Sequence, residues 1–315
     1  MNKIFFLATF ILLYSLSSAL AQVATAPGMY PDYQRFLGSL KYVQPAKQDL
    51  KDIWNNLLDS ASMLKDEAPI HITTAAVKKK TLDDEKIYDT RKNSVFIVGK
   101  LKKATAGPST VSFDLSGTAF AIGKNGVCVT NYHVLKDLIG KNKREIEGDS
   151  AWFIVSHNRN IYIIDRILAY SINNDLAVFS VITNDTPLLP VPVGKPAQTG
   201  ATVYTISHPG GYFYNFGKGI VSRNATIAGE QIVTGHNPQG KPHIRMEITA
   251  DYGIGASGGP VLDKYGNVVG VISVTTPLMA MGKDAAGNLT SGHVQMVIKS
   301  TVPVKALREL LGMDL

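Results

Sequence analysis

The chain has 315 residues, of which 45% are hydrophobic and 18% charged, and its formal net charge is +7. This is an ordinary globular composition, long enough for one large core or two small ones. Its short basic clusters, such as Lys78-Lys79-Lys80, lack interleaved aromatic residues, which favours solvated loops over nucleic-acid binding. A single cysteine, Cys128, excludes an internal disulfide, so stability must come from the core.

Residues 1–21 have the pattern of a secretory signal peptide. Lys3 precedes an apolar run from Ile4 to Tyr14, and small residues then lead to Ala19-Leu20-Ala21, which predicts cleavage before Gln22. The run is shorter than a membrane span, so we expect export without a membrane association after cleavage. The cleaved chain carries a net charge of +6, from 31 basic and 25 acidic residues. An exported chain without disulfides suggests a bacterial protein, either periplasmic or secreted.

Residues 22–84 are interpreted as a helical N-terminal extension. Residues 22 to about 40 are rich in Pro, Gly, Tyr and Ala, which indicates irregular structure, and residues 66–84 are typical of a charged linker. Between Lys47 and Lys65 the apolar residues have the spacing of an amphipathic helix. They are Leu50, Ile53, Trp54, Leu57, Leu58, Ala61 and Leu64. We expect this helix to dock on the main domain; a removable pro-segment is the alternative.

From about residue 85 to the end at residue 315, short strand-like runs separated by turns predict an all-β barrel or sandwich domain. The expected strands are 94–99, 117–122, 126–130, 151–155, 161–164, 176–181, 202–206, 219–222, 230–234, 243–248, 261–262, 268–273 and 293–298. The proline-rich stretch 183–192 is a plausible boundary between two halves. Helical spacing from Val302 to Leu311 predicts a terminal helix.

The stretch Gly255-Ala256-Ser257-Gly258-Gly259-Pro260 is the main candidate for chemistry. Its glycines allow a tight turn that aims the N–H groups of Gly255 and Ser257 at one point. An oxyanion formed beside the Ser257 hydroxyl would be stabilised there. A serine becomes a nucleophile only when a histidine accepts its proton and an acid orients that histidine.

His133 and Asp175 best meet this requirement. His133 follows the apolar run 127–130 at the point where a strand gives way to helical spacing, and Asp175 opens the apolar run 176–179 after an asparagine turn. The alternative, non-catalytic interpretations are that His133 is a structural histidine and that Asp175 caps a turn. Asp149 and Asp165 are rival acids, but no comparable apolar run follows either one.

The order of these residues excludes an α/β-hydrolase. That fold places a helix after the nucleophile and orders its residues serine, acid, histidine. Here a proline and a strand follow Ser257, and the order is histidine, acid, serine.

The sequence resembles the trypsin/chymotrypsin-like serine peptidases, most closely the bacterial exported branch that includes the high-temperature-requirement proteases. The resemblance covers about residues 88–312 and rests on four segments in the family's order: 130–134, 174–178, 207–222 and 255–260. It implies an all-β fold of two six-stranded antiparallel β-barrels, about residues 88–186 and 194–300, with a C-terminal helix. His133 and Asp175 would come from the first barrel and Ser257 from the second.

Three features extend or depart from the family pattern. Ala256 stands where digestive members have an aspartate that pairs with a newly cut N-terminus, so the resemblance implies a site preformed without that activation. Ser273 matches the serine that hydrogen-bonds the triad acid, and Val274 and Thr275 would form a wall for extended substrate. The chain ends soon after the terminal helix, so we expect no PDZ module.

Specificity stays open at this point. Asp251 lies six residues before Ser257, where the family places the floor of the primary pocket, and an acid there suggests Lys or Arg recognition. A structural role for Asp251 in a turn is an equally good interpretation. His293, in the strand that would form the opposite wall, resembles the histidine with which glutamyl endopeptidases read an acidic side chain. The two residues therefore point to opposite specificities.

The sequence thus predicts an exported serine endopeptidase that hydrolyses polypeptides through His133, Asp175 and Ser257 by way of an acyl-enzyme. We expect no cofactor and no metal, since no zinc-ligand spacing is present. A catalytically inactive trypsin-like peptide-binding protein is the alternative. The oligomeric state is left open.

Overall fold

The computed structural model describes residues 31–40, 47–103, 111–139, 150–183, 186–227, 242–283 and 289–314. The chain divides into two units, residues 1–43 and 44–315. In the first unit the structure has a helix, α2 (Tyr33–Leu40), where the sequence predicted irregular chain. Asp32 explains the difference, because its carboxylate accepts the Arg35 N–H at 2.9 Å and so satisfies one of the free donors at the helix start.

Six antiparallel strands of the second unit close into a first barrel in the order β1-β2-β3-β6-β5-β4. They are β1 (Val95–Lys103), β2 (Val111–Ala121), β3 (Val127–Thr130), β4 (Ser150–Ser156), β5 (Ile161–Ser171) and β6 (Leu176–Val181). Phe96, Ile154 and Phe179 fill its core, and Cys128 is buried among them. Burial raises the pKa of the Cys128 thiol, so this residue stays protonated and packs in the core as a small apolar side chain rather than acting as a nucleophile.

The next six strands close into a second barrel in the order β10-β11-β12-β9-β8-β7. They are β7 (Thr202–Ser207), β8 (Asn215–Ile227), β9 (His243–Ile248), β10 (Pro260–Leu262), β11 (Val268–Lys283) and β12 (Leu289–Pro303), followed by helix α6 (Val304–Leu310). The two barrels and the terminal helix confirm the predicted fold. The strand expected at 230–234 lies outside the described residues.

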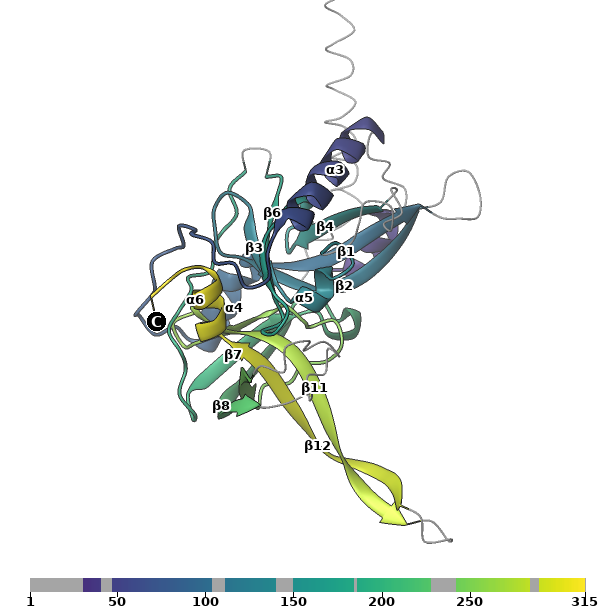
Figure 1. The fold of residues 1–315 in the computed structure, drawn as a ribbon. Helices are drawn as coiled ribbons and strands as arrows, with labels where there is room; N and C mark the ends of the chain where they lie inside the picture. Colours follow the sequence, from purple (N-terminus) through teal and green to yellow (C-terminus); the bar gives the residue numbers. More distant parts are fainter. Residues whose placement is uncertain are drawn as a thin grey trace, which may run out of the picture. The chain divides into compact units, whose positions relative to one another are not determined.

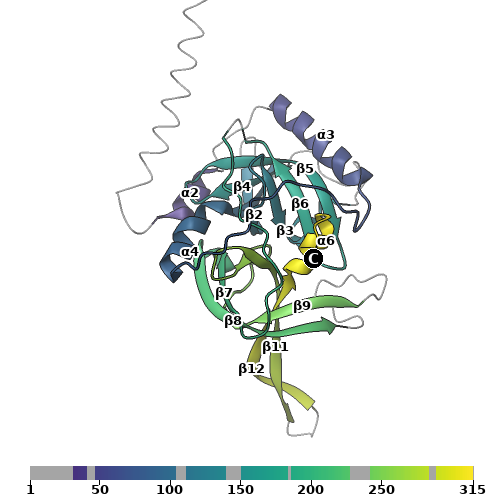
Figure 2. The same ribbon diagram turned by 90° about the vertical axis from the view of Figure 1, so that its left-hand side faces the viewer.

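Helix α3 (Lys47–Met63) lies along the first barrel, as Figures 1 and 2 show. Leu57, Leu58 and Ala61 belong to the same buried core as Phe96. The Ser60 hydroxyl accepts the N–H of Ile167 at 3.1 Å, where the pairing of β5 with β6 is irregular. The C-terminal part of the stripe predicted from the sequence, from Leu57 to Leu64, therefore packs on the barrel. None of the helices in the described part of the chain is long and apolar enough to cross a bilayer.

Residues 64–83, which include most of the charged linker predicted at 66–84, have no helix or strand and turn at Asp66–Glu67. They make backbone hydrogen bonds to both barrels, at Tyr170 and Lys264, and we call them the strap. A short helix, α4 (Asp84–Arg91), and a 3₁₀ turn, η1 (Lys92–Ser94), connect the strap to β1. Helix α4 buries only Ile87, so the sequence offers no apolar stripe from which to predict it.

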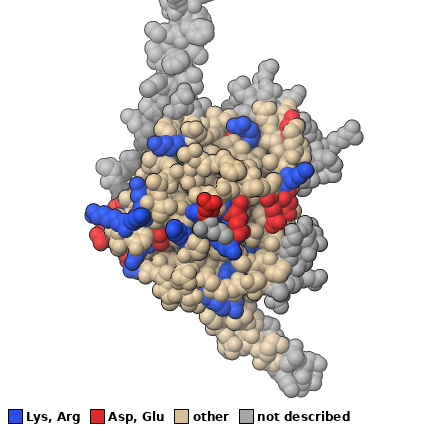
Figure 3. All heavy atoms as spheres, turned by 60° about the vertical axis from the view of Figure 1, so that its left-hand side comes forward, with Lys and Arg blue, Asp and Glu red and all other residues tan. Residues whose placement is uncertain are grey.

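Strands β11 and β12 continue as a long hairpin beyond the barrel, well past the ends expected from the sequence (Figures 1 and 2). Its exposed apolar side chains are Leu278, Met279, Met281, Val294, Met296 and Val297. Figure 3 shows charged side chains of both signs interspersed over the body of the molecule, whereas the described part of the hairpin has the tan colour of uncharged residues.

The loop from His208 to Tyr214, which includes the 3₁₀ turn η2 (Pro209–Gly211), joins β7 to β8 in the second barrel and contacts the first barrel. The hydroxyl of Tyr214 lies 3.3 Å from the Val95 carbonyl and 3.2 Å from the Val155 carbonyl, both on the first barrel. The backbone N–H of Tyr214 donates to His208 Nδ1 at 3.0 Å. Burial lowers the pKa of His208 to about 3, so this imidazole is a neutral acceptor at physiological pH.

Candidate active site

His133 is positioned by the end of β3. The strand stops at Thr130, and helix α5 (Tyr132–Leu135) begins one residue later with Asn131 as its N-cap. The Asn131 amide donates to the Asp175 carbonyl at 2.9 Å, and the His133 backbone N–H donates to Asp175 Oδ1 at 3.1 Å. Both contacts tie this strand end to the turn that precedes β6.

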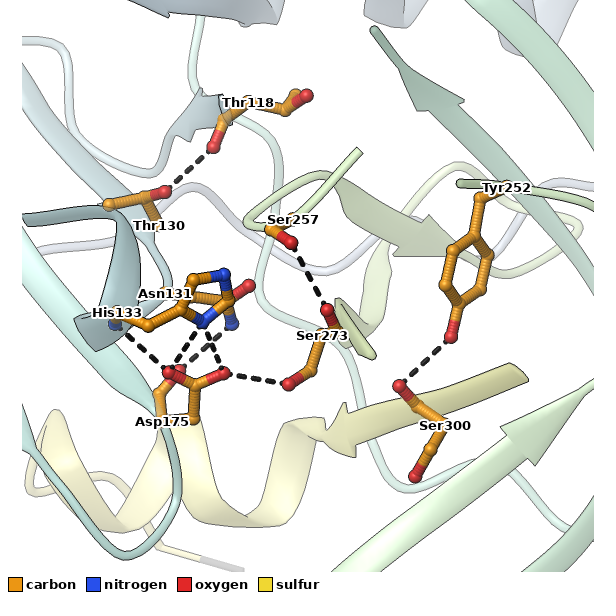
Figure 4. A network of polar contacts seen from close by, with 9 residues as sticks. All are labelled: Thr118, Thr130, Asn131, His133, Asp175, Tyr252, Ser257, Ser273 and Ser300. Atoms are coloured by element: carbon orange, nitrogen blue, oxygen red, sulfur yellow. Dashed lines mark hydrogen bonds and ion pairs between the residues drawn. The ribbon is translucent and has the colours of Figure 1, made fainter. Parts of the chain in front are cut away.

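Asp175 is fully buried and has a φ of 55°, in the left-handed region that few residues other than glycine adopt. Its carboxylate oxygens lie 3.0 and 2.9 Å from His133 Nδ1, and the Ser273 hydroxyl donates to Oδ2 at 2.7 Å (Figure 4). An ionised carboxylate only accepts hydrogen bonds, so Nδ1 carries the proton and the Nε2 lone pair is left to accept one.

Ser257 lies on a loop that approaches the first barrel very closely. A side chain at Gly258, where φ is +86°, would place its Cβ 2.1 Å from Thr130 Oγ1, so only glycine fits. The Thr118 backbone N–H donates to the Ser257 carbonyl at 2.8 Å, and its hydroxyl donates to the Gly255 carbonyl at 2.9 Å. These contacts fix the serine loop against the barrel that carries His133 and Asp175.

The peptide between Ile254 and Gly255 has a defined orientation. The Ile254 carbonyl accepts the Gly210 N–H at 2.6 Å, and a trans peptide directs its N–H opposite to its carbonyl. The Gly255 N–H therefore points away from Gly210. In the part of the chain that the structure describes, neither this N–H nor that of Ser257 has a hydrogen-bond partner. Two donors without partners on one short loop suit a developing negative charge.

The Ser257 hydroxyl donates to the Ser273 carbonyl at 3.1 Å, and Figure 4 draws no bond from it to His133. Serine has an unbranched side chain, and rotation about its single Cα–Cβ bond moves the hydroxyl between staggered positions. The structure thus brings Gly255, Ser257 and Ser273 of the second barrel to the His133–Asp175 pair. In this structure the Ser257 hydroxyl is hydrogen-bonded to the Ser273 carbonyl rather than to His133.

Ser273 and the two residues predicted as a substrate wall, Val274 and Thr275, lie together at the start of the projecting part of β11. Ser273 is buried, and Val274 and Thr275 are partly exposed. Behind them the buried Tyr252 hydroxyl lies 3.1 Å from the Val274 carbonyl and 2.9 Å from the Ser300 carbonyl of β12 (Figure 4). Burial raises the pKa of Tyr252, which stays a neutral donor that fixes the two strands.

Asp251 and His293 are placed differently from the other candidates. The Asp251 side chain is 95% exposed and pairs at 3.2 Å with Lys299, whose own side chain is 14% exposed. Lys299 also donates to the Tyr252 carbonyl at 2.9 Å. His293 is exposed on the hairpin, six residues along β12 from Lys299, which is about 20 Å at strand spacing. The structure does not bring His293 to the serine.

Sequence reasoning gave no role to two residues that hold this site. Thr118 fastens the serine loop and Asn131 fastens the Asp175 turn. Asn131 lies in a motif that pointed to His133, but no local signal marks Thr118, because its partners on the serine loop are distant in sequence. Arg245 is also buried, and burial lowers the pKa of its guanidinium while the nearby Asp175 charge opposes this shift. Across the described ranges, no group of three or more His, Cys, Asp or Glu side chains is arranged to hold a metal.

Comparison with known proteins gives consistent results. Residues 117–271 match a family model described as a trypsin-like peptidase domain. Protease Do-like 5, chloroplastic, from Arabidopsis thaliana is 29% identical over 176 residues, which cover 55% of this chain and 52% of that protein. A probable periplasmic serine endoprotease DegP-like from Hahella chejuensis is 27% identical over 159 residues, covering 50% of this chain and 29% of the relative.

A solved structure of the HtrA-type protease AlgW with a decapeptide has the same fold, with a TM-score of 0.51 and 18% identity over 73% of this chain and 66% of the other. The chain spans about half the length, or less, of the curated relatives it matches. The barrels, the motifs and these matches agree: residues 117–271 form a trypsin-like peptidase domain, and the chain is similar in sequence to Do-like serine proteases and in fold to an HtrA-type protease.

Proposed function

We propose that the protein is an exported serine endopeptidase that hydrolyses polypeptides through an acyl-enzyme. The observation that carries the proposal is the contact of the buried Asp175 carboxylate with the partly exposed His133 imidazole, at 2.9 Å, beside a serine loop with two N–H groups that lack partners among the described residues. The signal-peptide pattern of residues 1–21 and the periplasmic relatives support export. The neighbour solved with a decapeptide supports a polypeptide substrate.

In the proposed reaction His133 Nε2 accepts the Ser257 hydroxyl proton as Oγ attacks the scissile carbonyl carbon. The carbonyl oxygen becomes an oxyanion and is stabilised by the N–H groups of Gly255 and Ser257. Asp175 holds the proton on Nδ1 and stabilises the imidazolium. His133 then gives its proton to the leaving amine, and a water activated in the same way releases the acid from Ser257.

Substrate binding frees the nucleophile in this proposal. The Ser273 carbonyl accepts the Ser257 hydroxyl at 3.1 Å and, in the proposed complex, also accepts a backbone N–H of a chain bound along β11. This N–H competes with the Ser257 hydroxyl for the carbonyl, which favours rotation of the hydroxyl towards His133. The alternative function, a peptide-binding protein without turnover, is favoured by the same contact, because it leaves the serine unactivated.

A fluorophosphonate probe separates the two functions. We expect one probe molecule to attach to each chain, detected as a single mass addition and located at Ser257 by peptide mapping. Attack on phosphorus requires an activated serine and an oxyanion site, and needs no particular peptide sequence. A folded wild-type protein that binds peptides but takes up no probe would contradict the peptidase proposal and support the binding protein.

The primary specificity is proposed to lack a strong basic preference. Lys299 pairs with Asp251 at 3.2 Å, so the Asp251 carboxylate already has a positive partner. We expect Asp251→Asn to change kcat/KM by less than about threefold for peptides with Lys, Arg, Ala or Leu before the cut, since exposed ion pairs contribute little. A fluorogenic library varied at that position measures this. A loss of a hundredfold or more confined to Lys and Arg peptides would instead assign Asp251 as the basic-residue receptor.

A further inference from the structure

The turn that carries Asp175 is anchored by the strap, residues 64–83, as well as by the two barrels. The Ile172 N–H donates to the Asp66 carboxylate at 2.9 Å, and the Glu67 backbone N–H donates to the Tyr170 carbonyl at 2.9 Å. The Ser171 hydroxyl lies 3.3 Å from a Glu67 carboxylate oxygen. Every residue from 170 to 172 therefore contacts the strap.

These contacts reach the aspartate through one tight turn. The Asp175 N–H donates to the Ile172 carbonyl at 3.2 Å, and the Asn174 N–H donates to the Ser171 hydroxyl at 3.0 Å. Asp175 itself is held at a φ of 55°. A non-glycine residue keeps this conformation only when its surroundings determine it, and the hydrogen bond to Asp66 is one of those that do.

The Asp66 carboxylate also lies close to Tyr132, the neighbour of His133. Tyr132, next to His133, has its ring centroid 5.8 Å from that of Tyr170. Burial raises the pKa of Tyr132, and the charges of Tyr170, Asp66 and Asp175 raise it further. Leu64, Tyr132 and Ile172 pack on the same apolar core of the first barrel. The start of the strap is thus built into the wall behind the His133–Asp175 pair.

The rest of the strap fixes it to the second barrel and the terminal helix. The Ile70 N–H donates to the Leu310 carbonyl of α6 at 3.0 Å, and the Leu82 N–H donates to the Lys264 carbonyl at 3.0 Å. Asn267 bonds both backbone groups of Lys78, at 2.7 and 2.9 Å. Anchored at this end too, the strap is a fixed support for the Asp175 turn, and Figure 2 shows it running from α3 towards α4.

We propose that Asp66 is a positioning residue: it anchors the turn that holds Asp175 against His133, and the strap belongs to the working enzyme. The inference rests on the proposed peptidase function. It assigns to residues 64–83 a role that a discarded pro-segment does not have, because removal of the chain through Asp66 would leave the Ile172 N–H without its acceptor.

The test compares three full-length variants, Asp66→Ala, Asp66→Asn and Asp83→Ala. Asp83 is the matched control, since it is an exposed carboxylate of the strap that makes no side-chain bond at the start of α4. Fluorophosphonate titration counts competent sites, so kcat and KM are obtained per active molecule. Proton NMR follows the far-downfield signal of the His133 Nδ1–H bound to Asp175.

We expect Asp66→Ala to lower kcat per titrated site about tenfold with KM changed less than twofold, because a charge-assisted hydrogen bond is lost far from bound substrate. Asp66→Asn keeps an oxygen acceptor and should lose only about two- to threefold, and Asp83→Ala should equal wild type. The downfield signal should shift or broaden in Asp66→Ala alone.

Wild-type kcat in Asp66→Ala, together with an unchanged signal, overturns the inference. If Asp66→Ala does not fold, Asp66→Asn decides: full kcat and an unchanged signal overturn the inference just as well. Should wild type neither titrate nor turn over, the proposed function fails separately. The NMR signal then decides, since a resonance unaltered in Asp66→Ala and Asp66→Asn still rules out the positioning role.

Discussion

Replacing Ser257 with alanine will lower kcat for peptide hydrolysis by about 10⁵-fold or more, with little change in KM. The substitution removes the only atom that the proposed mechanism uses to form the acyl-enzyme. It keeps the backbone N–H that belongs to the oxyanion site and the carbonyl that accepts the Thr118 N–H at 2.8 Å. Steady-state hydrolysis of a fluorogenic peptide measures the loss, and a labelled peptide titrated into the variant measures retained binding.

Ser222→Ala is the control for this substitution. Ser222 is an exposed serine on β8, and its replacement removes a hydroxyl of the same size away from the site. We expect full activity from it. Hydrolysis by Ser257→Ala within tenfold of wild type would show that another group performs the attack.

Asp175→Asn will lower kcat by about 10⁴-fold while leaving the fold intact. An amide of the same shape keeps an oxygen that can accept the Ser273 hydroxyl, which lies 2.7 Å from Oδ2 in the native protein. It also presents an N–H₂ group, which stabilises the imidazole tautomer that has its lone pair on Nδ1 and its proton on Nε2. That tautomer cannot accept the serine proton. Peptide hydrolysis measures kcat, and thermal unfolding checks the fold.

The matched control is Asp165→Asn. Asp165 also accepts a serine hydroxyl, that of Ser180 at 2.7 Å, and pairs with Arg166 at 3.4 Å, but it does not contact His133. It was one of the two rival acids in the sequence, and its replacement should lower kcat no more than about twofold. A comparable loss in both variants would mean that Asp175 acts through stability rather than through the imidazole.

The barrels could be predicted from sequence because alternating apolar runs and turn residues are local signals. The runs 127–130 and 176–181, for example, became β3 and β6 with little change. Local pattern failed for α4, which buries only Ile87, and for the outer hairpin, where neither face is covered and no alternation marks the strands.

Within the site, motifs marked His133, Asp175 and Ser257 as candidates, because each stands at the boundary of a recognisable run. The contacts that hold them could not. Asp66 meets Ile172, and Lys299 meets Asp251, across 106 and 48 residues of sequence, and these contacts exist only after both barrels have folded. The direction of the Ser257 hydroxyl is a rotamer choice, which no residue type specifies.

The His208–Tyr214 loop has a mechanical consequence. One end holds the Ile254 carbonyl through Gly210, and the other pins the Tyr214 hydroxyl onto neighbouring strands of the first barrel. The peptide that presents the Gly255 N–H is therefore held in a fixed position relative to the first barrel, which supplies the His133 imidazole. If the two barrels shift relative to each other, this loop should move the Gly255 peptide together with the first barrel and so preserve its alignment with His133.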